Sequence, residues 1–209
     1  MHCKIVMSII MGILLLGNNL LAADTYQVDT AHSTIGFKVR HLGISYVTGK
    51  FDKFEGQLMF DGDQLTSLKG TADTTTINTA DSKRDGHLKS DEFFAADKFP
   101  TLIFESTKIT RTENILSVVG NLTMRGVTKV IVLQGQMGGF ANMGPVRKTG
   151  LVLEGDINRQ DFGLKFNKTL ETGQLMVGDQ VKISLELEAS MQTAAHAEVK
   201  NTAKEEVKK

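Results

Sequence analysis

The stretch VKISLELE, residues 181–188, carries the pattern from which the fold can be predicted. Its side chains alternate strictly, with an apolar set of Val181, Ile183, Leu185 and Leu187 against a polar set of Lys182, Ser184, Glu186 and Glu188. Successive side chains of a β-strand point to opposite faces, so a period of two is typical of a strand with one buried face. The stretch therefore predicts a sheet with one apolar side.

The same period recurs along most of the chain. The alternating apolar positions are Ile35, Phe37 and Val39; Phe54, Leu58 and Phe60; Leu102 and Phe104; Leu116, Val118, Leu122 and Met124; Ile131 and Leu133; and Leu151, Leu153 and Ile157. Turn sequences separate these runs, notably FDGDQ at 60–64 and the glycine pair at 138–139. We predict about eight strands in an all-β fold.

Glycines fall on the inward register of several predicted strands, at Gly56, Gly70, Gly120 and Gly155. A glycine inside a strand marks a bulge, a bend or the close approach of another group. Two interpretations stay open: a curved or closed sheet, or space for a ligand beside the backbone.

One segment ahead of the C-terminal end reads as helical. In SDEFFAADKF, residues 90–99, Ser90 is a good N-cap, two acidic residues follow it, and Pro100 ends the segment. We therefore predict a single short helix here. Its phenylalanines, Phe93 and Phe94 among them, need burial, for which the mouth of a barrel is suitable.

The two ends of the chain differ from its middle. Residues 1–23 combine a cation at Lys4, an apolar run from Ile5 to Leu16 and a pair of alanines, which is typical of a cleaved secretory signal peptide. That run is too short to span a bilayer, which takes about 20 residues. Cys3, the only cysteine, lies within the signal peptide, so we expect an exported, thiol-free mature protein in the periplasm. Residues 191–209 form a charged, polar tail that is either helical or disordered.

Charge argues against two classes of partner. Basic and acidic residues number 24 each, and loss of Lys4 with the signal peptide leaves a formal charge of about −1. We therefore predict no nucleic-acid partner and no stable membrane insertion.

A series of motifs resembles one known family. The stretches are DTAHS at 29–33, HLG at 41–43, GKF at 49–51, FEG at 54–56, RDGHLKSDEFF at 84–94, FPT at 99–101, GNLTMRGVTK at 120–129, INRQDFG at 157–163 and VGDQV at 177–181. Together they are similar to the YceI-like family of polyisoprenoid-binding proteins, with residues 24–190 as the domain. The resemblance implies an extended, eight-stranded antiparallel, lipocalin-like β-barrel whose apolar channel holds an isoprenoid chain. Members commonly have proline where this chain has Val130.

Inward-facing apolar residues are the candidates for lining such a channel. They are Phe37, Val39, Phe54, Phe60, Phe93, Phe94, Phe104, Leu122, Leu153 and Ile183. A barrel of eight strands can be filled by side chains or can hold one slim ligand, so each of these residues could also be plain core.

A polar rim is the second candidate site, formed by His32, Arg84, Asp85 and His87. These side chains can satisfy loop backbone groups, or they can orient a quinone oxygen or a phosphate. Their spacing matches no metal-binding or nucleophilic motif, so we predict no metal site and no catalytic residue.

Three classes of function follow. The leading hypothesis is a non-enzymatic periplasmic carrier of an isoprenoid quinone, a polyprenyl lipid or a similar amphiphile, with this lipid as its ligand and no other cofactor. The alternatives are an enzyme acting on such a lipid, and a stress-response interaction module with a vestigial cavity. A homodimer is compatible with each.

Overall fold

The computed structural model describes residues 23–192, and strands dominate it. The strands are β1 (Asp24–Val28), β2 (Thr34–His41), β3 (Ser45–Phe51), β4 (Phe54–Asp61), β5 (Gln64–Asp73), β6 (Ile77–Asn78), β7 (Thr101–Thr112), β8 (Ile115–Met124), β9 (Val127–Met143), β10 (Val146–Asn158) and β11 (Val177–Met191). The helical elements are α1 (Ser82–Lys89) and the 3₁₀ turns η1 (Thr74–Thr76) and η2 (Arg159–Phe162). In this described range, no helix combines the length and apolar character needed to cross a membrane.

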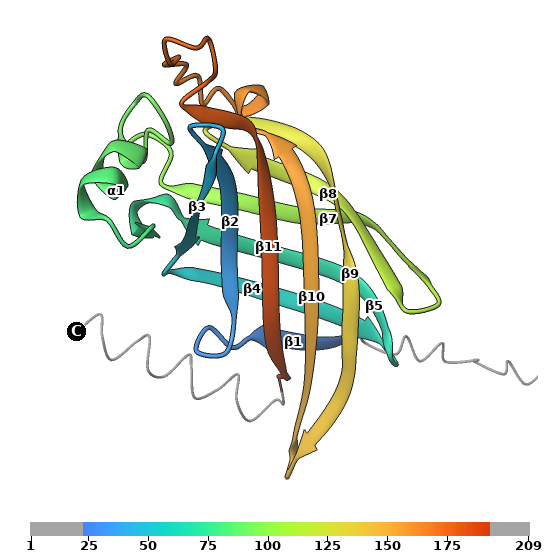
Figure 1. The fold of residues 1–209 in the computed structure, drawn as a ribbon. Helices are drawn as coiled ribbons and strands as arrows, with labels where there is room; N and C mark the ends of the chain where they lie inside the picture. The colour runs from blue at the N-terminus through green and yellow to red at the C-terminus, as the bar shows by residue number, and fades with distance from the viewer. Residues whose placement is uncertain (1–22, 193–209) are drawn as a thin grey trace, which may run out of the picture.

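Eight strands close into a ring (Figure 1). The hydrogen-bonded order is β1-β4-β5-β7-β8-β9-β10-β11, and β11 pairs again with β1, with every neighbouring pair antiparallel. The predicted eight-stranded, lipocalin-like antiparallel barrel with one short helix is therefore confirmed. Three further strands, β2, β3 and β6, extend the sheet beyond the ring from β11.

Strand β11 belongs both to the ring and to this extension. One edge pairs with β10 over residues 180–190. The other edge pairs with β2 over residues 177–186 and with β1 over residues 189–191. The ring therefore closes directly at the β1 end, whereas β2 continues the wall toward the other end. In Figure 1, β2, β11, β10 and β9 run steeply across β4, β5, β7 and β8, which lie behind them.

Two glycines allow the sheet to turn its corner. Gly135 of β9 pairs with Leu116 of β8 and with Leu153 of β10, so β9 passes from one layer to the other at this point. A Cβ atom on Gly135 would lie 1.9 Å from the Val152 carbonyl oxygen, and one on Gly155 would lie 2.6 Å from that of Val132. At these two positions the sheet bends too closely for a side chain.

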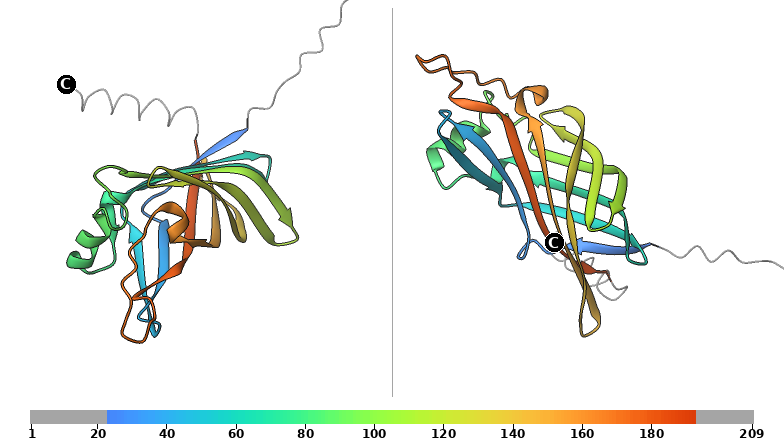
Figure 2. Two further views of the ribbon diagram at one scale, coloured as in Figure 1. Left: turned by 90° about the horizontal axis from the view of Figure 1, so that it is seen from above. Right: turned by 45° about the vertical axis from the view of Figure 1, so that its right-hand side comes forward.

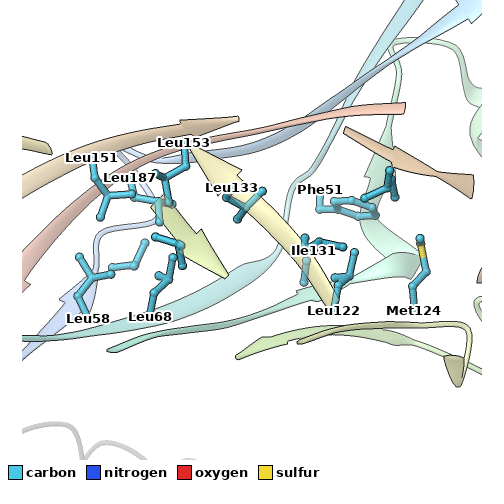
Figure 3. Close-up of a cluster of buried hydrophobic side chains, with 14 of the residues drawn as sticks. Phe51, Leu58, Leu68, Leu122, Met124, Ile131, Leu133, Leu151, Leu153 and Leu187 are labelled. Atoms are coloured by element: carbon cyan, nitrogen blue, oxygen red, sulfur yellow. The ribbon is translucent and has the colours of Figure 1, made fainter. Parts of the chain in front are cut away.

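Leucines and aromatic rings fill the interior nearest β1. Leu58 and Leu153 are fully buried there, and Figure 3 shows Leu58, Leu68, Leu151, Leu153 and Leu187 gathered in one cluster. Complete burial of such a side chain contributes about 1.5–3 kcal/mol to folding. We call this group the leucine layer.

The predicted helix is wrong in position. Residues 91–99 form turns, and the helix α1 precedes them, with Asp81 as its N-cap accepting a hydrogen bond from the Arg84 amide at 3.0 Å. Ser90 is the C-cap, and Ala95 has φ +48°, which no α-helix accommodates. Helix α1 has no buried residue and so lacks the apolar face that would reveal it in the sequence. It lies outside the barrel, on the side opposite the tip of the β7–β8 hairpin (Figures 1 and 2).

The terminal segments were predicted separately. The signal peptide falls almost wholly outside the described residues, and so does the tail beyond residue 192. Met191, the first residue of that tail, still belongs to β11 and pairs with Tyr26.

Candidate functional site: an apolar cavity in the barrel

A cavity of about 170 Å³ lies inside the barrel, away from the aromatic residues near β1. Its walls come from β2 and β11 on one side, from β4, β5, β7 and β8 on the other, and from the turns after α1. Eight of the ten predicted channel residues line it: Phe37, Val39, Phe54, Phe93, Phe94, Phe104, Leu122 and Ile183. Most of the residues predicted to line a channel therefore do face this cavity.

The two remaining predicted residues, Phe60 and Leu153, do not line this cavity. Both have no exposed surface: Leu153 belongs to the leucine layer, and Phe60 packs edge-on against Tyr26 with ring centroids 5.0 Å apart. An inward register cannot distinguish a cavity wall from packed core, because both positions face the interior.

Bare backbone forms part of the wall. Gly56 and Gly70 face each other across β4 and β5, and both line the cavity. A Cβ on Gly56 would lie 2.9 Å from Val28 Cγ2, and one on Gly70 would lie 3.1 Å from the Glu55 carbonyl oxygen. Gly120 serves a different purpose, because the Phe104 ring occupies the place of its side chain at 2.4 Å. The predicted glycines thus divide between cavity wall, ring packing and the sheet corner.

Arg84 and Asp85, two of the predicted rim residues, hold one buried threonine. Asp85 Oδ1 accepts hydrogen bonds from the amide and hydroxyl of Thr79 at 2.9 and 2.6 Å. Arg84 donates to the Thr79 hydroxyl and carbonyl oxygens, both at 2.8 Å. Neither residue lines the cavity. Their contacts fasten α1 to the chain that follows β6.

His87 lies one side chain away from the cavity. Its ring hydrogen bonds to Glu92 and packs edge-on against Phe93 and Phe166, with centroids 5.0 and 5.3 Å apart. Of these partners Phe93 lines the cavity. His87 therefore supports the wall from outside.

His32 lies at the turn between β1 and β2, away from the other three rim residues. Its Nδ1 is 2.9 Å from Asp29 Oδ2, and this hydrogen bond lowers the pKa of Asp29. Ligand atoms of Asp29, His32 and Glu188 lie within 4.8 Å of one another. Lys148 is 2.7 Å from Glu188 and 3.7 Å from Asp29, so it supplies the positive charge that a metal ion would bring.

Arg159 was not among the predicted site residues, yet it lines the cavity and is 2% exposed. Its guanidinium donates to the carbonyl oxygens of Leu164 at 2.6 Å and Gly178 at 2.9 Å, and to Asp179 Oδ1 at 2.8 Å. Burial lowers the pKa of Arg159, and the Asp179 charge opposes this effect. Its motif, INRQDFG, was visible in the sequence, but its burial was not.

A closed eight-stranded antiparallel barrel with an apolar interior places this chain in the lipocalin-like class of architecture. The sequence profile of the YceI-like domain matches residues 26–189. A UPF0312 protein of Staphylococcus aureus (strain N315) is 36% identical over 170 residues, covering 79% of this chain and 97% of that protein. The chain therefore belongs to the YceI-like family.

Solved structures share the fold. The Campylobacter jejuni YCEI protein is 33% identical with a TM-score of 0.65, covering 79% of this chain and 96% of that one. BcnA of Burkholderia cenocepacia is 24% identical with a TM-score of 0.64, over 77% of this chain and 98% of that one. A polyisoprenoid binding domain from Saccharophagus degradans is 16% identical with a TM-score of 0.59, over 80% and 98% of the two chains.

Proposed function

We propose that this protein binds the chain of an isoprenoid quinone or polyprenyl lipid in the barrel cavity, and that it carries or sequesters the lipid without chemically changing it. The observation that carries the proposal is the wall of the cavity, which consists mainly of aliphatic side chains, phenylalanine rings and glycine backbone. Such a wall offers a hydrocarbon chain favourable burial and offers little to a polar molecule.

The energetics of this proposal rest on burial alone. Each CH₂ group removed from water contributes about 0.8 kcal/mol, so ten of them contribute roughly 8 kcal/mol before the cost of association is subtracted. No catalytic group is needed for tight binding. The rim residues Arg84, Asp85 and His87 are engaged in contacts within the protein.

The size of the cavity adds a structural requirement. Its 170 Å³ resembles the roughly 150 Å³ of an apolar cavity that holds benzene, and is smaller than the roughly 300 Å³ or more of larger ligand sites. A long chain therefore requires side chains of the wall or the leucine layer to move. Phe37, Phe54 and Phe104 line the cavity and are only partly buried, so we expect them to move before the fully buried leucines do.

The proposal also includes the compartment in which the lipid is bound and the need that binding meets. The signal-like residues 1–23 support export to the periplasm, where a lipid moving between two membranes would need a protein that covers it. The Saccharophagus degradans relative, described as polyisoprenoid binding, supports the ligand class.

Native mass spectrometry of the protein purified from its own periplasm tests the proposal. We expect a stoichiometric adduct that solvent extraction removes and that is then identified as a quinone or polyprenyl lipid. A bare protein mass, together with no uptake of added ubiquinone, would show the proposal to be wrong.

A matched pair of variants locates the bound chain. Val39→Trp adds a large ring inside the cavity, whereas Val152→Trp places the same ring on the outer surface, where Val152 is 52% exposed. We expect the first variant to lose lipid and the second to keep it. Loss in both, or in neither, would mean that the lipid binds elsewhere.

A further inference from the structure

The hydroxyl of Tyr26 is buried without a hydrogen bond. Tyr26 has no exposed surface, and among the side chains of the described residues its oxygen is the buried polar atom that lacks a partner. Leaving a buried hydroxyl unpaired costs about 1–3 kcal/mol, so a phenylalanine here would serve the free protein better. The oxygen therefore calls for an explanation outside the stability of the free protein.

The surroundings of this hydroxyl are aromatic, with one cation at the edge. The Tyr26 ring packs against Phe60 and Phe140, with centroids 5.0 and 6.0 Å away. Arg147 lies over the Phe140 ring at 3.7 Å, and its guanidinium hydrogen bonds to Asp63 at 2.6 Å. Burial raises the pKa of Tyr26, and both the charge of Arg147 and its hydrogen-bonding N–H groups oppose this, so the two groups are close. Their geometry nevertheless does not meet that of a hydrogen bond.

Apolar side chains lead from the cavity to the Tyr26 ring along β1. Val28 lines the cavity, and Tyr26 is the next residue of β1 on the same inward face, about 7 Å along the strand. Leu58 of β4 pairs directly with Tyr26. On its other side Leu58 pairs with Leu68 of β5, which lines the cavity as Val28 does. Leu58 and Leu68 belong to the leucine layer (Figure 3), so this layer lies between the cavity and the Tyr26 ring. A slim chain that displaced these side chains would bring its end to the tyrosine.

We propose that the Tyr26 hydroxyl donates a hydrogen bond to an oxygen at the end of an apolar chain that lies lengthwise in the barrel. The ligand class is a single-chain lipid ending in an acceptor oxygen, either a quinone carbonyl or a prenyl phosphate. Arg147 supplies the positive charge if that end is a phosphate. This site rests on the proposed function, and it assigns the polar end of the lipid to the β1 end of the barrel, away from the predicted rim.

Tyr26→Phe removes the oxygen and keeps the ring, which gives two effects of opposite sign. The melting temperature of lipid-free protein should rise by about 2 °C, because an unpaired buried group is lost. Affinity for a short-chain ubiquinone should fall about 5-fold, whereas affinity for squalene, a hydrocarbon without an acceptor, should stay unchanged. Tyr46→Phe is the matched control, since Tyr46 is the other tyrosine of the chain and is exposed on β3.

Two further measurements separate the sources of the oxygen. Infrared spectroscopy of bound ubiquinone should show a carbonyl band shifted by hydrogen bonding in the native protein and in Tyr46→Phe, and unshifted in Tyr26→Phe. Arg147→Gln should weaken geranylgeranyl phosphate and leave ubiquinone unchanged. Weakening of the phosphate alone by both variants would assign the site to prenyl phosphates.

Other outcomes would overturn the assignment. A lower melting temperature of Tyr26→Phe would mean that the hydroxyl is already satisfied in the free protein. Equal weakening of ubiquinone and squalene would mean that the ring, not the oxygen, contributes. Unchanged binding of all three lipids by Tyr26→Phe would place the polar end elsewhere while lipid binding itself stands. If the native protein binds none of the three, the proposed function fails first.

Discussion

The two ends of the barrel differ in how a buried polar group is hydrogen-bonded. At the end where β10 passes into η2, Arg159 is 2% exposed, and its guanidinium donates to three backbone carbonyl oxygens and one carboxylate. At the β1 end, the Tyr26 hydroxyl is fully buried and has no partner. Hydrogen bonds of Arg159 stabilise the first end, whereas the unpaired hydroxyl of Tyr26 destabilises the second. This difference marks the Arg159 end as structural and the Tyr26 end as adapted to a ligand.

Loss of the Arg159 guanidinium should have the largest effect. Arg159→Met removes the cation that pairs with Asp179 and the donor to the carbonyl oxygens of Leu164 and Gly178, so the free energy of unfolding should fall by about 3–5 kcal/mol in urea titrations. At the opposite end, Arg147→Met removes a pair with the largely exposed Asp63 and should change stability little. Equal losses would remove the contrast between the two ends.

Truncation of the leucine layer should be the next largest effect. Leu153→Ala opens a void in packed core and should cost about 3 kcal/mol, whereas Ile183→Ala enlarges a cavity that already exists and should cost about 1 kcal/mol. Lipid uptake should rise or persist in Leu153→Ala, because the path toward Tyr26 widens. Denaturant midpoints measure the stability of the two variants, and quinone binding measures their lipid uptake. Equal losses of stability would contradict the division between the leucine layer and the cavity.

The Thr79 cluster offers a smaller test that separates structure from binding. Thr79→Val removes the hydroxyl that Asp85 and Arg84 share, so unfolding should become easier by about 1–2 kcal/mol while lipid affinity stays the same. A drop in affinity at unchanged stability would instead return these two residues to a ligand-orienting role.

The smallest effect should come from pH. The hydrogen bond from His32 lowers the pKa of Asp29 in the folded protein, so this carboxylate contributes stability above its unfolded pKa of about 3.9 and loses that contribution as pH falls through its lower folded pKa. The stability difference between the native protein and Asp29→Asn should therefore be present at pH 6 and shrink below pH 4. A difference independent of pH would contradict this assignment.

Local patterns in the sequence predicted some strands correctly and misplaced the helix. Apolar residues at every second position revealed the inward faces of β8, of β10 and of β11 from Val181 onward, because these stretches keep a regular register. In β5 the pattern is broken: a register shift in the β4–β5 pairing places Leu65 and Leu68 on the same inward side, three residues apart. Residues 90–99 resembled a helix because an N-cap serine, two acidic residues and a final proline are helix signals, whereas α1 itself is mostly polar and has only Leu88 to pack on the core.

The sequence by itself determined the class of the fold, its family and part of the cavity wall, because a period of two and a set of motifs are local properties of the chain. Tertiary structure alone decided which inward residues face empty volume and which are packed, since that depends on strands far apart in sequence. It also decided that Arg159 finds acceptors on β11 and on the chain that leads into it, and that Tyr26 finds none. A hydrogen bond is lost when the donor–acceptor distance grows by a few tenths of an ångström. Distances between residues far apart in sequence are fixed to that precision only in the closed barrel.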